Sequence, residues 1–256
     1  RTITSSTNRQ PIQSTNHDHY YIITCGTSLR LRIFVLSAMS TSKQLLLNIC
    51  KQLFQTKHQH HSPASIARLT TFLKDAPPTD FLEQDTFHRL NHSPIVYYPI
   101  HDTTDPWIVG IFVLPPHAKI PIHDHPKMCV TSKLLFGNCH LTSYDWLTTA
   151  LHSSTGNTPP RHVTHQYAEL IDGAWMETNE VWSLFEDNGN LHAITAGEEG
   201  CALLDVISPD YDQERKCTYY KEEDSNGTCT TDAQSLKKNN VKNIQKLVPY
   251  DPNLIV

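Results

Sequence analysis

The chain has 256 residues, enough for a single domain with a substantial core. A formal net charge of −5 and an isoelectric point near 6.3 exclude the basic surface typical of nucleic-acid-binding proteins, and no charged face suited to a membrane surface is present. The seven cysteines lack paired spacing, which favours reduced thiols and a cytoplasmic location, with a nuclear one also open. We expect a monomer that binds neither nucleic acid nor membrane.

Residues 1–38 have no pattern typical of a folded element. Their moderately apolar stretch, residues 20–38, is interrupted by Arg30 and Arg32, so its apolar run is too short to span a membrane. It also lies too far into the chain for a signal sequence. The segment that begins at Met39 is a plausible start of the functional protein. We therefore expect residues 1–38 to be a poorly ordered or non-native extension.

Residues 39–92 are predicted to form a helical segment. Apolar residues at helical spacing predict one amphipathic helix over residues 43–55 and a second over residues 64–74. A Ser-Pro pair just before the second helix supplies an N-cap and a first-turn proline. A weaker helical pattern covers residues 80–89.

Residues 93–221 change to short apolar segments separated by clusters of Gly, Asn, Asp and Pro. This regular spacing of short strand-like segments is typical of an antiparallel barrel or jelly roll. We therefore predict a mainly β, double-stranded β-helix preceded by helices. The segments are VYYPI, WIVGIFVL, KIPIHDH, CVTSKLLFG, CHLTSYDW, HVTHQYAEL, EVWSLF, LHAIT and CALLDVIS. Residues 222–256 form a polar tail, and whether its end returns as a strand is left open.

The segment at residues 119–146 carries the strongest functional signal. His123 and His125 alternate in an apolar strand, so their rings project from one face. A later segment, residues 187–208, supplies His192 after an Asn-Gly turn. Three histidines converging in a barrel predict a facial metal site. The alternative is that they only satisfy hydrogen bonds in the core, which suits one buried histidine better than three.

Two other histidine-rich strings lack this context. His17 and His19 lie in a polar stretch, and His58, His60 and His61 end a helix-like run. Neither string has a surrounding strand or a third ligand, so both are interpreted as solvated histidines.

Together the two segments resemble the two-part signature of the cupin superfamily. The first part joins His-x-His to a later glycine, which His123, His125 and Gly137 match. The second part is Gly-x-x-His, which Gly189 and His192 match. The resemblance implies a cupin barrel that holds a metal ion.

One position departs from that signature. Where cupins carry an acidic ligand, this chain has Val130, with Cys129 beside it. Three neutral imidazoles leave a divalent ion with its full charge and about three open positions, a centre that favours a thiolate. A zinc or nickel enzyme, such as a hydrolase or isomerase, and a non-catalytic cupin with a structural metal remain open at this point.

Longer motifs resemble a narrower family, the cysteamine (2-aminoethanethiol) dioxygenases and plant cysteine oxidases. The motifs are SKLLFGNCHLTSYDW, LLDVISPDY and KCTYY, in this order within residues 95–221. The resemblance implies one Fe(II) per chain, held by His123, His125 and His192. It also implies addition of both atoms of dioxygen to a thiol, giving a sulfinic acid. The implied substrate is either cysteamine or the N-terminal cysteine of a peptide or protein. An N-terminal cysteine as substrate implies an oxygen-sensing role.

The resemblance also implies roles for four other residues. Asp205 and Tyr211 match positions that handle the substrate, and a carboxylate suits an amine beside a thiol. A structural carboxylate and a packing tyrosine are the alternatives. Cys217 and Tyr219 match a pair that forms a thioether crosslink in the animal enzyme. The alternative is a free cysteine that lies near a core tyrosine.

Two further positions differ from the family's usual residues. Lys127 replaces the glycine of a His-Pro-Gly-Met motif, and Asp210 replaces a second proline after Pro209. Lys127 is expected near the mouth of the site, where it would influence which substrate enters.

Overall fold

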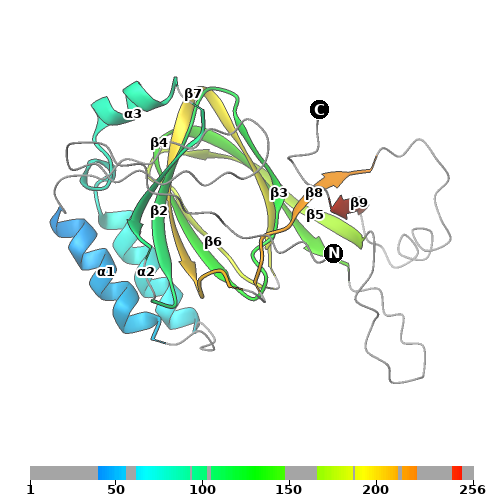
Figure 1. Ribbon diagram of the computed structural model, residues 1–256, viewed down its shortest axis with the longest axis horizontal. Helices are drawn as coiled ribbons and strands as arrows, with labels where there is room; N and C mark the ends of the chain where they lie inside the picture. Colours follow the sequence, from blue (N-terminus) through cyan, green and yellow to red (C-terminus); the bar gives the residue numbers. More distant parts are fainter. Residues whose placement is uncertain are drawn as a thin grey trace, which may run out of the picture.

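The computed structural model describes residues 40–55, 62–92, 94–102, 105–147, 166–186, 188–212, 215–223 and 244–249. The predicted extension at residues 1–38, both histidine-rich strings and most of the tail lie outside these ranges. Within them, helices come first in the chain and strands follow (Figure 1). No helix among the described residues is long and apolar enough to cross a membrane.

The N-terminal helices lie close to the ranges that the sequence predicts. They are α1 (Thr41–Leu53), α2 (Pro63–Asp75), the short 3-10 helix η1 (Pro78–Asp80) and α3 (Gln84–Leu90). The Ser40 and Ser62 side chains cap α1 and α2 by accepting a backbone N–H of the first turn. The two predicted amphipathic helices are therefore confirmed, and the weaker third pattern splits into η1 and α3.

The strands form a closed barrel. They are β1 (Val96–His101), β2 (Ile108–Leu114), β3 (Lys119–His123), β4 (Cys129–Trp146), β5 (Gln166–Glu177), β6 (Val181–Leu184), β7 (Leu191–Ser208), β8 (Tyr219–Glu222) and β9 (Ile244–Pro249). Their order is β1-β2-β7-β3-β8-β9-β5-β4-β6, and an additional β7–β4 pairing closes the sheet. The predicted mainly β, cupin-type barrel with N-terminal helices is confirmed.

Two strands are longer than the sequence predicts. CVTSKLLFG and CHLTSYDW form one strand, β4, and LHAIT and CALLDVIS form one strand, β7, each of 18 residues. The β4–β7 ladder continues through two bulges, one of them next to Gly137. Gly137 has φ +72°, and a Cβ there would lie 2.1 Å from the carbonyl oxygen of Gly200. The glycine therefore bends the strand without ending it.

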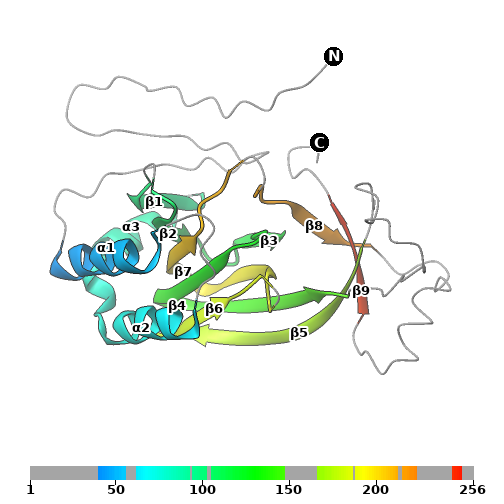
Figure 2. The ribbon, with the colours of Figure 1, turned by 90° about the horizontal axis from the view of Figure 1, so that it is seen from below.

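Helices cover one side of the barrel, and β9 lies at the opposite end (Figures 1 and 2). Outward-facing apolar residues of β1, β2 and β7 pack with those of α1 and α2 in one large core. Lys133 on β4 is fully buried below these helices and donates from Nζ to the carbonyls of Leu73 and Ala76. Its charge thus meets the C-terminal end of α2, where the helix dipole favours a cation.

The end of the tail returns to the sheet. β9 pairs with β5 and with β8, so part of residues 222–256 belongs to the folded body.

Candidate metal centre

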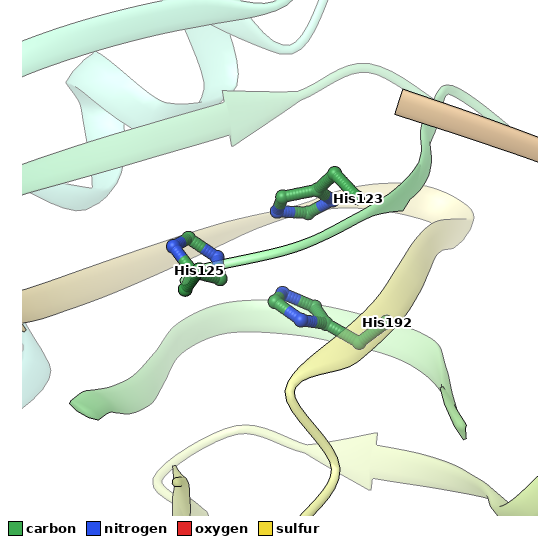
Figure 3. A group of neighbouring side chains, drawn as sticks. All are labelled: His123, His125 and His192. Atoms are coloured by element: carbon green, nitrogen blue, oxygen red, sulfur yellow. The ribbon is translucent and has the colours of Figure 1, made fainter. Parts of the chain in front are cut away.

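Three histidines from two segments of the chain converge inside the barrel. His123 ends β3 and lies directly opposite His192 on β7, while His125 follows two residues beyond β3. One nitrogen from each ring lies within 4.8 Å of the others, and each residue is at most 8% exposed. Figure 3 shows the rings around a common space. The pairing of β3 with β7 therefore brings together the two sequence motifs.

Hydrogen bonds at Nδ1 orient the rings. His123 Nδ1 lies 2.9 Å from the Pro121 carbonyl, and His192 Nδ1 lies 3.2 Å from the Asn190 carbonyl. A carbonyl oxygen can only accept, so Nδ1 carries the proton in both rings. The lone pair is then on Nε2, and such a bond to the other nitrogen is usual for histidines that bind metals.

Burial keeps the three rings neutral. It lowers the pKa of His123, and it lowers the pKa of His125 and His192 well below the usual value. Repulsion from the neighbouring histidines lowers the latter two further. Metal binding requires the neutral imidazole, so the burial of the cluster favours ligation.

The donor set fits a divalent transition metal. Among the described residues, the cluster contains no carboxylate or thiol. Val130, at the position where cupins carry an acid, is 2% exposed and packs with Met128, Leu184 and Ile207. Three imidazoles without a carboxylate suit iron, zinc or nickel and leave coordination positions for other ligands.

Asp205 is a buried carboxylate on β7. It lies opposite Ser132 of β4, whose Oγ donates to Oδ1 over 2.6 Å. Among the described residues, no donor reaches its other oxygen. Burial raises the pKa of Asp205 to about 6, against a smaller opposing effect of the Ser132 bond. The charge of Asp205 also raises the pKa of Tyr211, so the two groups lie within electrostatic reach of each other.

Tyr211 reaches the cluster from the loop after β7. Its hydroxyl lies 2.7 Å from Nδ1 of His125, and the two ring centroids are 5.9 Å apart. Burial raises the pKa of Tyr211 well above its usual value, so the hydroxyl stays neutral. Tyr211 therefore gives His125 the Nδ1 partner that backbone carbonyls give the other two histidines.

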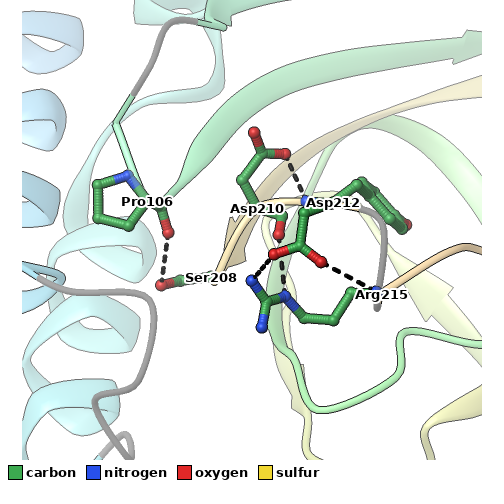
Figure 4. A network of polar contacts seen from close by, with 6 residues as sticks. Pro106, Ser208, Asp210, Asp212 and Arg215 are labelled. Atoms are coloured by element: carbon green, nitrogen blue, oxygen red, sulfur yellow. Dashed lines mark hydrogen bonds and ion pairs between the residues drawn. The ribbon is translucent and has the colours of Figure 1, made fainter.

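A polar network holds the loop that carries Tyr211 (Figure 4). Arg215 is 5% exposed, forms an ion pair with Asp212 and donates from Nε to the Asp210 carbonyl over 3.2 Å. Asp210 accepts the Tyr211 N–H at Oδ1 over 2.6 Å and donates its own N–H to the Pro106 carbonyl over 3.1 Å. A proline at position 210 would have neither the N–H nor the carboxylate.

Tyr219 lies beside the cluster. Tyr219 begins β8 opposite His123, with ring centroids 6.0 Å apart, and Cys217 precedes the strand. Asp124, between two of the histidines, accepts the Thr218 N–H over 2.7 Å and the Tyr220 hydroxyl over 2.9 Å. The start of β8 is thus attached to the His-Asp-His turn. The crosslink between Cys217 and Tyr219 stays a prediction.

Three residues at this centre were missed by the sequence argument. Asp124 and Asn190 lie inside the recognised motifs as unspecified positions, and Ser132 opens SKLLFG. Their partners come from other segments of the chain, so no local pattern signals them. A polar residue at a position otherwise expected to be apolar is the one available clue, and it applies to Ser132.

A closed β-barrel with a buried cluster of three histidines defines a cupin-type protein with a candidate metal centre. The PCO_ADO family model matches residues 54–254, and the chain belongs to this family.

The chain is 35% identical over 197 residues to plant cysteine oxidase 1 of Arabidopsis thaliana, covering 71% of this chain and 64% of that protein. It is 34% identical over 143 residues to a probable 2-aminoethanethiol dioxygenase of Dictyostelium discoideum, covering 54% and 61%. The human 2-aminoethanethiol dioxygenase is 30% identical over 145 residues, covering 51% and 53%. The chain thus spans less than two thirds of these relatives.

Two solved structures are also similar to part of this chain. The cupin domain of Cnp3 from Schizosaccharomyces pombe has a TM-score of 0.33 and 13% identity, covering 46% of this chain and 66% of that chain. KdgF from Halomonas sp. has a TM-score of 0.32 and 11% identity, covering 47% and 83%.

Proposed function

We propose that this chain is an iron(II)-dependent thiol dioxygenase that converts a thiol to a sulfinic acid, with His123, His125 and His192 holding one iron ion. The observation that carries the proposal is the buried, neutral three-histidine cluster without a carboxylate, in a chain of the PCO_ADO family. Such a cluster leaves the ion its full charge and room for other ligands. We further propose that residues 93–221 form the catalytic domain and residues 39–92 a helical segment packed on it.

The substrate is proposed to be a thiol with a neighbouring amine. The relatives' names specify cysteine and 2-aminoethanethiol, and both compounds carry an amine two carbons from the sulfur. A buried carboxylate with one oxygen open is a suitable acceptor for that ammonium group, and Asp205 provides it. Both cysteamine and the N-terminal cysteine of a peptide or protein present this aminothiol unit.

Bound iron would supply open coordination positions and the redox chemistry that brings thiol and dioxygen together. The protein's own residues bind and orient the reactants. Asp205 binds the ammonium group, and Ser132 holds Asp205 by its hydrogen bond. Tyr211 fixes the ring of His125, and Cys217 and Tyr219 are proposed to border the position of the thiol.

The overall reaction balances without another reductant or cofactor. One thiol and one dioxygen molecule give one sulfinic acid: the O–O bond and the S–H bond are broken, and two S–O bonds form. The sulfur loses four electrons and the two oxygen atoms gain them, while the thiol proton remains on the acid or passes to water.

The test is oxidation of defined thiols by the iron-loaded protein. Metal-free protein is loaded anaerobically with iron(II) and then exposed to air with a cysteine-initiated peptide, and the product is analysed by mass spectrometry. The expected result is a gain of two oxygen atoms. The N-acetylated peptide is the matched control, because it keeps the thiol and loses the cationic amine. A parallel reaction with cysteamine identifies the preferred substrate.

A zinc-loaded sample separates oxygenation from other roles of the same site. Zinc has no redox chemistry, so the zinc form should leave the peptide unchanged. If the iron form also leaves both the peptide and cysteamine unchanged, the proposal is wrong, and a ligand-binding cupin becomes the better account.

A further inference from the structure

The backbone of His125 lies where no strand partner is available. β3 ends at His123, so the peptide groups of His125 are outside the ladder that holds the other two histidines. His125 is nevertheless only 4% exposed, and buried N–H and C=O groups require partners. The Met128 N–H donates to the His125 carbonyl over 3.1 Å, so the N–H of His125 is the group that needs a partner from another segment.

Asn190 binds both peptide groups of His125. Its Oδ1 accepts the His125 N–H over 2.8 Å, and its Nδ2 donates to the His125 carbonyl over 2.7 Å. One side-chain amide thus pairs with His125 as a neighbouring strand would. Asn190 is 8% exposed, so water does not readily replace these bonds.

The same residue also contacts His192. The Asn190 backbone carbonyl accepts the Nδ1–H of that ring over 3.2 Å. Gly189, just before it, has φ +68° and donates its N–H to Oδ1 of Asp145, which fixes the approach of the chain to Asn190. Asn190 therefore joins two of the three histidines, which come from separate parts of the sequence.

We propose that Asn190 is a positioning residue that sets the placement of His125 relative to His192 and thereby the affinity of the centre for its metal. The inference rests on the metal centre in the proposed function and not on the thiol chemistry. A primary amide carries an acceptor and a donor on separate atoms, so it can accept the N–H and donate to the carbonyl of one residue at once. An ionised aspartate at this position would accept the N–H but could not donate to the carbonyl.

The test measures metal binding by the full chain in the metal-free form. Cobalt(II) and iron(II) dissociation constants are obtained by competition with a chromophoric chelator, together with the visible spectrum of the cobalt form. The Asn190→Ala substitution should weaken binding about 10- to 100-fold, as is usual when a group that orients a metal ligand is removed. The Asn190→Asp substitution, nearly identical in shape, should weaken it less and alter the cobalt spectrum.

Asn91 offers a matched control. It is also a buried asparagine, 7% exposed, and its Nδ2 donates to the Glu199 carbonyl, but it contacts no histidine of the cluster. The Asn91→Ala substitution should lower the melting temperature of the metal-free protein and leave its metal affinity unchanged. Since Asn190→Ala could unfold the loop, the comparison of Asn190→Asp with Asn91→Ala decides the question.

The outcomes separate this inference from the proposed function. Unchanged metal affinity and spectrum in Asn190→Asp, or equal losses of affinity in that variant and Asn91→Ala, would overturn the role of Asn190. A wild-type chain that binds neither metal would overturn both proposals. A chain that shows the expected Asn190 effects but oxidises no thiol would support the positioning role and contradict only the proposed function.

Discussion

The hydroxyl of Tyr211 lies 2.7 Å from Nδ1 of His125 and thereby connects the loop after β7 to the three-histidine cluster. The loop is itself held by Arg215, which is buried and bound to Asp210 and Asp212. A side chain outside the cluster thus orients one of its rings.

Removing that hydroxyl tests its role. The Tyr211→Phe substitution keeps the ring and deletes the bond, so we expect about 10-fold weaker metal binding and a lower kcat. Metal affinity is measured by chelator competition, and kcat by the formation of sulfinic acid. Tyr144→Phe is the matched control, because Tyr144 is a buried tyrosine whose hydroxyl donates to Glu222. Equal behaviour of the two variants would contradict the assigned role.

Substitution of Asp205 should raise the stability of the protein and lower its activity. Burial raises its pKa from 3.8 to about 6. Between these values the folded state holds a proton that the unfolded state has lost, so stability falls as pH rises. The Asp205→Asn substitution removes this cost and should raise the free energy of unfolding at pH 7 by up to about 3 kcal/mol, with the gain vanishing below about pH 4.

The same substitution should impair turnover. Loss of a charged acceptor should reduce kcat/KM for a cysteine-initiated peptide about 10- to 100-fold. In the wild type, kcat/KM should fall as pH drops below about 6, because the carboxyl becomes protonated. A less stable Asp205→Asn protein at pH 7, measured by denaturant unfolding, would contradict the stability argument, and unchanged kcat/KM would contradict the substrate role.

Lys127 occupies a turn that favours glycine. The Met128 N–H donates to the His125 carbonyl over 3.1 Å, and Lys127 has φ +56°. A left-handed conformation costs a residue with a Cβ about 1–2 kcal/mol. Lys127→Gly should therefore raise the free energy of unfolding by about 1 kcal/mol, measured in denaturant. Lys127→Ala removes the charge but keeps the Cβ and should give no such gain. A similar gain in both variants would identify the charge as the cause.

Asp124 and Tyr220 should be energetically coupled. The Tyr220 hydroxyl donates to Asp124 Oδ2 over 2.9 Å, and Asp124 also accepts the Thr218 N–H. Asp124→Ala should cost more stability than Tyr220→Phe, because it removes two bonds. A double-mutant cycle should give a coupling free energy of about 1 kcal/mol. Strict additivity would show that the turn and β8 are held independently.

The helices and the cluster could be predicted because their signals are local. Apolar spacing and a Ser-Pro cap define α2, and His-x-His with Gly-x-x-His defines the cluster. The continuity of β4 could not be predicted, since a glycine at a bulge has the same sequence pattern as a glycine in a turn. The role of Asn190 could not be predicted from the sequence either, because it depends on the contact between the segment after β3 and the segment before β7.

The account depends most directly on the three histidines acting together as the metal site of a thiol oxidation. Wild-type and His192→Ala proteins, each loaded with iron(II), would be given a cysteine-initiated peptide under isotopically labelled dioxygen. We predict that the wild type binds about one iron per chain and that both labelled oxygen atoms enter the product, while the variant loses iron and turnover together. Full turnover by His192→Ala, or oxygen in the product that derives from water, would contradict the account.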